Sequence, residues 1–271
     1  MERIKITSYM FHDIVESGDL SDSGLPENWD MRGADAYKLD INQFEYCLSV
    51  LCKKLDWSPL LLEEGIELER NEEFFILTFD DGGSSAYTTT CNILLKYKLF
   101  GHFFVVTDFI GKPSFLNENQ IIHLRKSGHV IGSHSCSHPY RMSSCSMKEL
   151  EYEWGKSVNI LSDIIGEQII TASVPGGYYS PAVAQAASKS GIKFLFTSEP
   201  ISKIHKVENC WVINRLTIKR KMKDKHLMKL FTGATIPRLQ QWVSWNIKKL
   251  AKHLLGEYYL AIRNSAFDIS K

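Results

Sequence analysis

The sequence predicts an α/β fold in which helices cover a parallel sheet or barrel. Apolar runs typical of buried strands alternate with segments of helical period along most of the chain. The connections between these runs are long enough for the crossovers that parallel strands require. The chain has 271 residues, a length at which α/β barrels are routinely single domains.

Seven apolar runs account for the expected strands. They recur along the chain with one helical segment or loop between successive runs, which is the order of a β-α-β architecture. We expect strands at residues 4–11, 73–79, 101–107, 129–133, 168–174, 193–198 and 210–218.

Capping patterns and apolar spacing predict the helices. Asp40 precedes a helix with Gln43 at the capping-box position, and SMKE (146–149) is a second capping box, which opens a helix to about Ile165. The apolar face of the first helix would consist of Phe44, Leu48, Leu51 and Leu55. Further helices are expected at 85–97, from Asn117, at 180–191 and from about Pro237.

Composition and charge set broad limits on function. Hydrophobic residues make up 44% and charged residues 23%, and the net charge of +1 gives no global field that would attract nucleic acid. No run of about 18 apolar residues predicts a membrane span, and the first residues lack an apolar signal segment. The six cysteines form no C-x-x-C pair, so we expect reduced thiols in a cytoplasmic protein. The turn-rich stretch 24–33 and the charge run 219–225 are expected to be loops.

Residues suited to catalysis follow three of the predicted strands. Asp80 and Asp81 end one strand, His134 and His138 follow another, and Pro175–Gly177 follow a third. Ligands bind at the carboxyl ends of the strands in parallel α/β folds. These groups should therefore gather on one face of the molecule.

Two histidines four residues apart and an adjacent carboxylate would give three protein ligands to a metal. If the chain turns helically after the strand, the imidazoles of His134 and His138 point the same way. Three ligands with an open water position are typical of catalytic zinc, which lowers the pKa of its water to roughly 7. One aspartate would bind the metal, and the other would stay ionised and take a proton from that water.

Each pattern taken alone has a plain structural explanation. An H-x-x-x-H pair is more often a solvated turn, and adjacent aspartates after a strand are more often a helix cap or a turn. The occurrence of both patterns at strand ends, in a chain of this size, favours the catalytic metal site.

The motifs TFDDG (78–82), GSHSCSH (132–138) and VPGG (174–177) resemble those of polysaccharide deacetylases with a NodB-homology domain, carbohydrate esterase family 4. The resemblance covers residues 4–218 and implies a distorted (β/α) barrel of about seven parallel strands. It also implies a divalent metal, usually zinc, and hydrolysis of an N-acetyl group from an amino sugar.

The resemblance further assigns roles to individual residues. Asp80 corresponds to the catalytic base, and the metal ligands correspond to Asp81, His134 and His138. The backbone N–H that helps to hold the oxyanion would belong to Gly176.

The chain departs from the family pattern in three places. Ser173 stands where the family has an arginine that orients the catalytic aspartate, Gly176 stands at an aromatic position, and the late L-x-H that supplies the general acid is absent. Members that resemble poly-N-acetylglucosamine deacetylases carry that histidine near the start, so His12 is the candidate acid, with a capping or packing histidine as the alternative. Tyr178 and Arg215 are the expected substrate-binding residues. Arg215 is also a candidate to replace the missing arginine, or to form a plain structural ion pair.

These residues predict a metal-dependent carbohydrate N-deacetylase that acts in the synthesis of a surface polysaccharide or glycolipid. The expected substrate is a nucleotide sugar, a lipid-linked saccharide or a soluble oligosaccharide that faces the cytoplasm. One alternative is deformylation of a lipid-linked amino sugar. Another is a catalytically silent carbohydrate-binding domain, which the serine at position 173 favours.

We expect the barrel to span residues 1–235, followed by an amphipathic helix and tail at 236–271. An apolar stripe recurs every three or four residues at Leu239, Val243, Ile247, Leu250 and Leu254. Lysines 248, 249 and 252 and tryptophans 242 and 245 fall on the other side. Packing of the stripe against the barrel is the favoured interpretation, and peripheral binding to an anionic membrane through 238–255 is the alternative.

Overall fold

A computed structural model describes residues 5–16, 36–53, 58–63, 73–201 and 204–255, with side chains described as far as residue 247. The expected loop at 24–33 and Leu55 lie outside the described residues.

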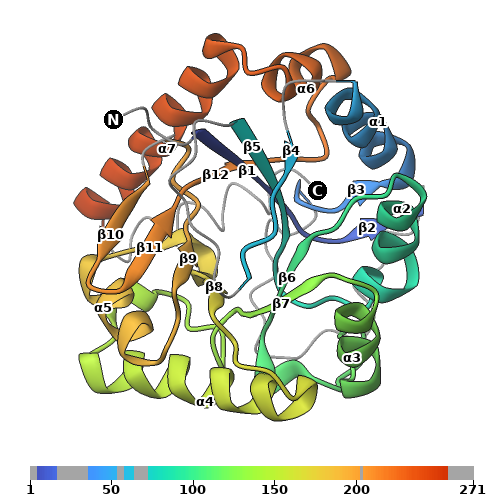
Figure 1. Cartoon of the computed structure of the whole chain (residues 1–271). Coiled ribbons are helices and arrows are strands. Elements are labelled where there is room, and N and C mark those ends of the chain that lie inside the picture. The colour runs from blue at the N-terminus through green and yellow to red at the C-terminus, as the bar shows by residue number, and fades with distance from the viewer. Residues whose placement is uncertain (1–4, 17–35, 54–57, 64–72, 202–203, 256–271) are drawn as a thin grey trace.

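A closed ring of parallel strands forms the centre of the molecule (Figure 1). Strand β11 pairs with β9, whereas β12 pairs with β1, and only Asn214 separates β11 from β12 in the chain. This single extended segment therefore joins the two ends of the sheet and closes it into a barrel. The ring consists of β1 (Lys5–Phe11), β5 (Glu73–Phe79), β6 (His102–Val105), β7 (Val130–Ser133), β8 (Thr171–Ser173), β9 (Phe194–Phe196) and the pair β11 (Cys210–Ile213) and β12 (Arg215–Thr217).

The seven predicted strands and the barrel class are confirmed. The described residues also form four short strands beyond the ring. Strand β10 (His205–Val207), which the sequence did not indicate, runs antiparallel to β11, and β4 (Ser58–Pro59) pairs with β5. Strands β2 (Ile14–Val15) and β3 (Leu39–Asp40) form a separate small sheet.

Helices surround the barrel, as Figure 1 shows. Asn117 and Ser146 both form complete capping boxes, so the predicted starts of α3 and α4 are confirmed. Asp40 caps α1, but the Gln43 side chain donates to the carbonyl of Met222 instead of completing the predicted box. The helices are α1 (Ile41–Cys52), a π-helical turn η2 (Ala86–Thr90) that leads into α2 (Cys91–Lys96), α3 (Glu118–Lys126), α4 (Met147–Ile165), α5 (Pro181–Lys189), α6 (Asp224–Phe231) and α7 (Thr235–Leu255).

The barrel interior and the layer under the helices are separate apolar clusters. Alternate residues of a strand point to opposite faces, so in β5 Ile76 belongs to the interior cluster while Leu77 and Phe79 belong to the outer one. Phe104 and Phe196 fill the interior from β6 and β9. This apolar interior lies beneath the candidate site.

The charge run at 219–225 was expected to be a loop, and this prediction is wrong for its last two residues. Helix α6 begins at Asp224 and buries Leu227, Leu230 and Phe231 against the outer layer. The apolar spacing that drives this burial lies beyond the charge run, so local charge alone misplaced the boundary.

The favoured packing of the α7 stripe is also wrong. Leu239, Val243 and Ile247 are 53%, 42% and 63% exposed, whereas on the opposite face Pro237 is buried and Arg238, Gln241 and Trp245 are half-buried. There the Gln241 side chain bonds to the backbone of Thr217. None of the described helices is long and apolar enough to cross a membrane.

Candidate active site

The two adjacent aspartates point to different partners because the chain turns sharply after β5. The Asp80 N–H still donates to the carbonyl of Phe11 in the neighbouring strand, at 3.1 Å. Asp81 then adopts a left-handed conformation with a φ of 74°, which is uncommon for a residue other than glycine. Asp80 is buried over the barrel interior, whereas Asp81 is partly exposed at the mouth.

Asp81, His134 and His138 converge at this mouth. The Asp81 Oδ1 atom lies 3.2 Å from Nε2 of His134 and 3.7 Å from Nε2 of His138. One candidate ligand atom from each of the three residues lies within 4.8 Å of the others. The sequence thus predicted a grouping that the structure brings together.

The loop that presents the histidines is not the helical turn that we expected. Ser135 and His138 have φ values of 65° and 59°, so the chain passes through left-handed conformations. The Glu153 carboxylate of α4 accepts hydrogen bonds from the N–H groups of Cys136 and Ser137, both at 2.9 Å. A buried carboxylate therefore holds the loop between the two histidines in place.

The electrostatics of the three residues fit a divalent cation. Burial and the neighbouring His134 lower the pKa of His138 to about 4, so its imidazole is neutral near pH 7. Burial alone would raise the pKa of Asp81, but the hydrogen bond from His134 and the charge of His12 hold it below its usual range. A neutral imidazole and an ionised carboxylate are the forms that bind metal.

A hydrogen bond from β8 orients the first imidazole. Nδ1 of His134 lies 3.1 Å from the carbonyl oxygen of Ser173, which can only accept a hydrogen bond. A proton on Nδ1 satisfies this carbonyl and would leave Nε2 to bind a cation held between His134 and Asp81. Second partners of this kind are usual for metal-binding histidines.

Arg215 binds Asp80 through two parallel hydrogen bonds. Nη1 and Nη2 lie 2.7 and 2.8 Å from the two carboxylate oxygens. Burial would raise the pKa of Asp80, but the Arg215 charge holds it below its usual range. Nη1 also donates to Thr78, and Nε donates to the carbonyl of Thr197.

This position corrects the substrate-binding role that we expected for Arg215. Its side chain has no accessible surface, and its hydrogen bonds go to Asp80, Thr78 and Thr197. The guanidinium lies 5.8 and 5.9 Å from the rings of Phe104 and Phe196, at the top of the barrel interior. Arg215 is therefore placed to orient Asp80 and not to contact a substrate.

Ser173 connects the two halves of the site. Its hydroxyl donates to Oδ1 of Asp80 at 3.1 Å, and the same oxygen lies 2.5 Å from Nδ1 of His134. At the position where the resemblance implies an arginine, the chain thus has a small side chain, and Arg215 reaches Asp80 from β12.

The model of the polysaccharide deacetylase family matches residues 68–195, which include all three metal-site residues, Asp80 and Ser173. Residues 68–195 thus match the polysaccharide deacetylase family. The chain is 29% identical over 133 residues to a peptidoglycan-N-acetylglucosamine deacetylase of Bacillus cereus, covering 49% of this chain and 60% of that protein. It is 27% identical to the peptidoglycan-N-acetylmuramic acid deacetylase PdaA of Bacillus subtilis, covering 47% of each. The chain spans about half the length of the curated relatives it matches.

Solved structures show the same deacetylase fold. The Streptococcus pyogenes deacetylase PplD, in complex with acetate, superposes with a TM-score of 0.68 at 22% identity, over 84% of this chain and 98% of that one. IcaB from Ammonifex degensii gives a TM-score of 0.64 at 16% identity, over 86% of this chain and 99% of that one.

His12 reaches the candidate active site from the end of β1. Its Nε2 atom lies 4.0 Å from Oδ2 of Asp81, and its ring packs on Tyr37 with centroids 4.7 Å apart. Within the described residues, its buried Nδ1 has no hydrogen-bond partner. His12 is therefore at the carboxyl-end face, where the sequence placed it.

An aromatic and basic group lies in the loops after His138 and β8. Gly176 has a φ of 59°, and Tyr178 follows in the same turn. The Arg141 guanidinium lies 5.4 Å from the centroid of the Tyr178 ring, and the centroid of the Tyr140 ring lies 6.0 Å from that of Tyr178. Arg141 makes no salt bridge within the described residues.

Sequence reasoning missed Glu153 and Arg141. A signal for Glu153 was present, because it falls on the apolar face of α4 between Leu150 and Trp154 and a carboxylate there needs a buried partner. No local signal marks Arg141, since its position matters only through the neighbouring loop.

Proposed function

We propose that this protein is a metal-dependent deacetylase that hydrolyses the N-acetyl group of an amino sugar in the synthesis of a surface polysaccharide or glycolipid. The observation that carries the proposal is that the two adjacent aspartates have different partners. Asp81 joins His134 and His138, while Asp80 is paired separately with Arg215. The deacetylases that the chain resembles, which their names describe as acting on peptidoglycan, support this reaction class.

Asp81, His134 and His138 would hold the divalent cation, and two imidazoles with one carboxylate suit Zn²⁺. A cation held there would polarise the amide carbonyl and make water a stronger acid. The remaining chemistry falls to the side chains and backbone groups around it.

Asp80 is the proposed general base. Arg215 keeps its carboxylate ionised, and the hydroxyl of Ser173 fixes one of its oxygens. An ionised carboxylate in this position can take a proton from the attacking water as the carbon–oxygen bond forms. Asp80 and Arg215 are both buried above the apolar barrel interior, which shields them from solvent.

His12 is the proposed general acid. The departing amine needs a proton, because an amide anion is a very poor leaving group, and imidazole is well matched to that transfer near neutral pH. Its Nε2 atom lies 4.0 Å from Oδ2 of Asp81, beside the residues that would hold the cation. The backbone N–H of Gly176 would hydrogen-bond the developing oxyanion.

Tyr178 is the proposed contact for the sugar ring. Aromatic faces bind the apolar faces of sugars, and the guanidinium of Arg141 lies over the same ring. The pair would favour an amino sugar that carries a phosphate or carboxylate group nearby.

Two alternatives use the same site. Deformylation of a lipid-linked amino sugar requires the same water attack on a smaller acyl group. The serine at position 173 favoured a silent carbohydrate-binding domain, because the resemblance implies an arginine there that orients the catalytic aspartate. The pairing of Arg215 with Asp80 weakens that argument, because binding alone does not need a base held ionised.

Release of acetate and formate from a panel of N-acylated substrates tests the proposal. The panel should include nucleotide sugars, oligosaccharides and lipid-linked saccharides, with Zn²⁺ added or removed by a chelator. We expect metal-dependent acetate release from at least one class, absent in the Asp81→Asn variant. Binding of a saccharide without release of either acid, in zinc-loaded protein, would favour the silent domain.

A further inference from the structure

Helix α7 turns its apolar stripe away from the barrel, whereas an ordinary amphipathic helix packs its apolar stripe against the protein. Two polar side chains of α7 bond to the barrel: Gln241 bonds to both the N–H and the carbonyl of Thr217, and Arg238 donates to the hydroxyl of Thr7. These contacts fix the rotation of the helix about its own axis. The apolar stripe is therefore directed away from the barrel.

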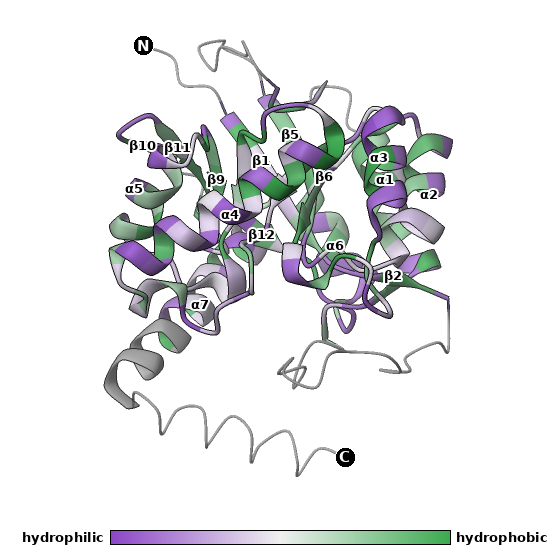
Figure 2. Ribbon diagram, turned by 90° about the horizontal axis from the view of Figure 1, so that it is seen from below, coloured by the Kyte–Doolittle hydropathy of each residue, from purple (hydrophilic) through white to green (hydrophobic). Residues whose placement is uncertain are grey.

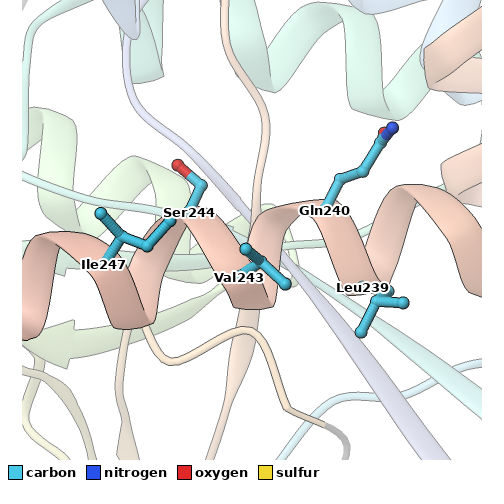
Figure 3. Close-up of a pocket in the computed structure, with 5 residues that line it drawn as sticks. All are labelled: Leu239, Gln240, Val243, Ser244 and Ile247. Atoms are coloured by element: carbon cyan, nitrogen blue, oxygen red, sulfur yellow. The ribbon is translucent and has the colours of Figure 1, made fainter.

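The exposed stripe forms one continuous surface along the helix. Ile236, Leu239, Val243 and Ile247 recur at helical spacing and are all exposed, and Trp242 lies exposed at their margin. Figure 3 shows Leu239, Val243 and Ile247 along α7 where, with Gln240 and Ser244, they line a groove of about 430 Å³. Large exposed apolar surfaces of this kind mark interaction sites.

The charge of the chain segment that carries this surface is strongly one-sided. Residues 219–255 contain ten lysines and arginines and one acidic residue, whereas the rest of the chain contains 22 basic and 30 acidic residues. Four of these basic residues, Lys221, Lys223, Lys225 and Lys229, are exposed in and just before α6, which packs beside α7. Met228 adds a further exposed apolar side chain to α6.

These features together indicate the chemistry of the surface that the exposed stripe would bind. An exposed apolar stripe with a tryptophan at its margin, in a segment with ten basic residues and one acidic residue, matches a helix that lies in an anionic lipid surface. A polar partner protein would not require the four exposed aliphatic side chains, and a neutral surface would not use the excess of lysine. We propose that α7, with the basic start of α6, binds the surface of an anionic membrane.

The direction of α7 suits such a role for the active site. Arg238 contacts Thr7 near the start of β1, and Gln241 contacts Thr217, which lies beside Met10 near its end. Successive turns of the helix thus approach the carboxyl-end face, where the candidate active site lies. In Figure 2, α7 lies at the edge of the molecule, as a lipid-facing helix must.

Sedimentation with vesicles tests the proposal without any need for turnover, so its outcome is separate from that of the deacetylase assay. The full chain is mixed at low salt with vesicles of phosphatidylcholine and phosphatidylglycerol, or of phosphatidylcholine alone. We expect it to sediment with the anionic vesicles and to be released by added salt.

The test variant is Leu239→Ser/Val243→Ser/Ile247→Ser, in which all three replaced side chains are exposed, so that the fold should be kept. We expect its binding to be at least about tenfold weaker, because burial of a single aliphatic side chain is worth that much. The matched control is Leu95→Ser/Tyr152→Ser, which removes two exposed apolar side chains on α2 and α4 and should bind as the unchanged chain does.

Three results would overturn the proposal. The full chain could stay in the supernatant with both kinds of vesicle, or the triple variant could sediment as fully as the unchanged chain. Light scattering could also show a dimer that the triple variant converts to a monomer, in which case the stripe binds a second copy of the chain.

Discussion

Replacing Arg215 with methionine removes the positive charge that faces Asp80 while keeping a side chain of similar length. Both partners are buried, with exposed side-chain fractions of 0% and 4%, so water cannot take the place of the guanidinium. Loss of one partner from a buried ion pair costs about 3–5 kcal/mol of unfolding free energy. Two further hydrogen bonds, to Thr78 and Thr197, are lost as well, so we expect the upper part of that range.

Arg125 provides the matched control. It pairs with Glu63 and Glu167 at 3.0 and 2.8 Å, but on the surface, where such pairs contribute less than about 1 kcal/mol. Urea denaturation should therefore show a large loss of stability for Arg215→Met and a small one for Arg125→Met. In the double variant Asp80→Asn/Arg215→Met the unpaired charge is gone, so its loss should be smaller than that of Arg215→Met alone.

The pH dependence provides a second readout. In the unchanged protein the pKa of Asp80 lies below its unfolded value, so the pair stabilises the fold above the unfolded pKa and this stabilisation is lost as the pH falls through the folded pKa. Without Arg215, burial raises the pKa of Asp80. The variant should then lose stability as the pH rises through the raised pKa, and the acidic limb of its rate profile should move to higher pH.

If Arg215→Met does not fold, Arg215→Lys keeps the charge without the paired geometry and should show a smaller shift in the same direction. The reasoning is refuted if Arg215→Met unfolds with the same free energy as Arg125→Met, or if the acidic limb does not move.

The remaining predictions concern the metal, the base and the acid. His134→Ala should lower the zinc content measured after dialysis, whereas His123→Ala on α3 should not; equal zinc in both variants would exclude the proposed site. Asp80→Asn should keep its zinc and lose about 10²–10⁴-fold in kcat, and zinc loss here would mean that the two aspartates have exchanged roles. His12→Gln should lower kcat and remove the basic limb of the pH–rate profile at unchanged zinc content, and an unaltered basic limb would show that another group is the acid.

The sequence predicted those parts of the fold that depend on neighbours along the chain. The helix start at Asn117 and the capping box at Ser146 are local signals, and both helices begin where these signals indicate. The orientation of α7 is different, because it depends on two polar contacts with β1 and β12 that no local pattern reveals. Hydrophobic periodicity locates the stripe of a helix but does not say which surface covers it.

The same distinction applies to the residues of the candidate site. His134 and His138 lie four residues apart and Asp81 follows another strand, so the rule that carboxyl ends of parallel strands share one face predicted that the candidate ligands meet. Arg215 lies 135 residues from Asp80, and only closure of the barrel places them side by side.

Closure of the ring also explains how Ser173 can stand where the resemblance implies an arginine. Asp80 ends β5 above the barrel interior, and side chains from β8 and β12 both reach it. A buried carboxylate needs a positive partner at a fixed distance, but the strand that supplies the partner is not fixed by that need. With Arg215 on β12 meeting this requirement, position 173 can hold a serine that donates to Asp80 and lies against His134. The departure from the family motif is therefore better explained as a relocated charge than as a lost one.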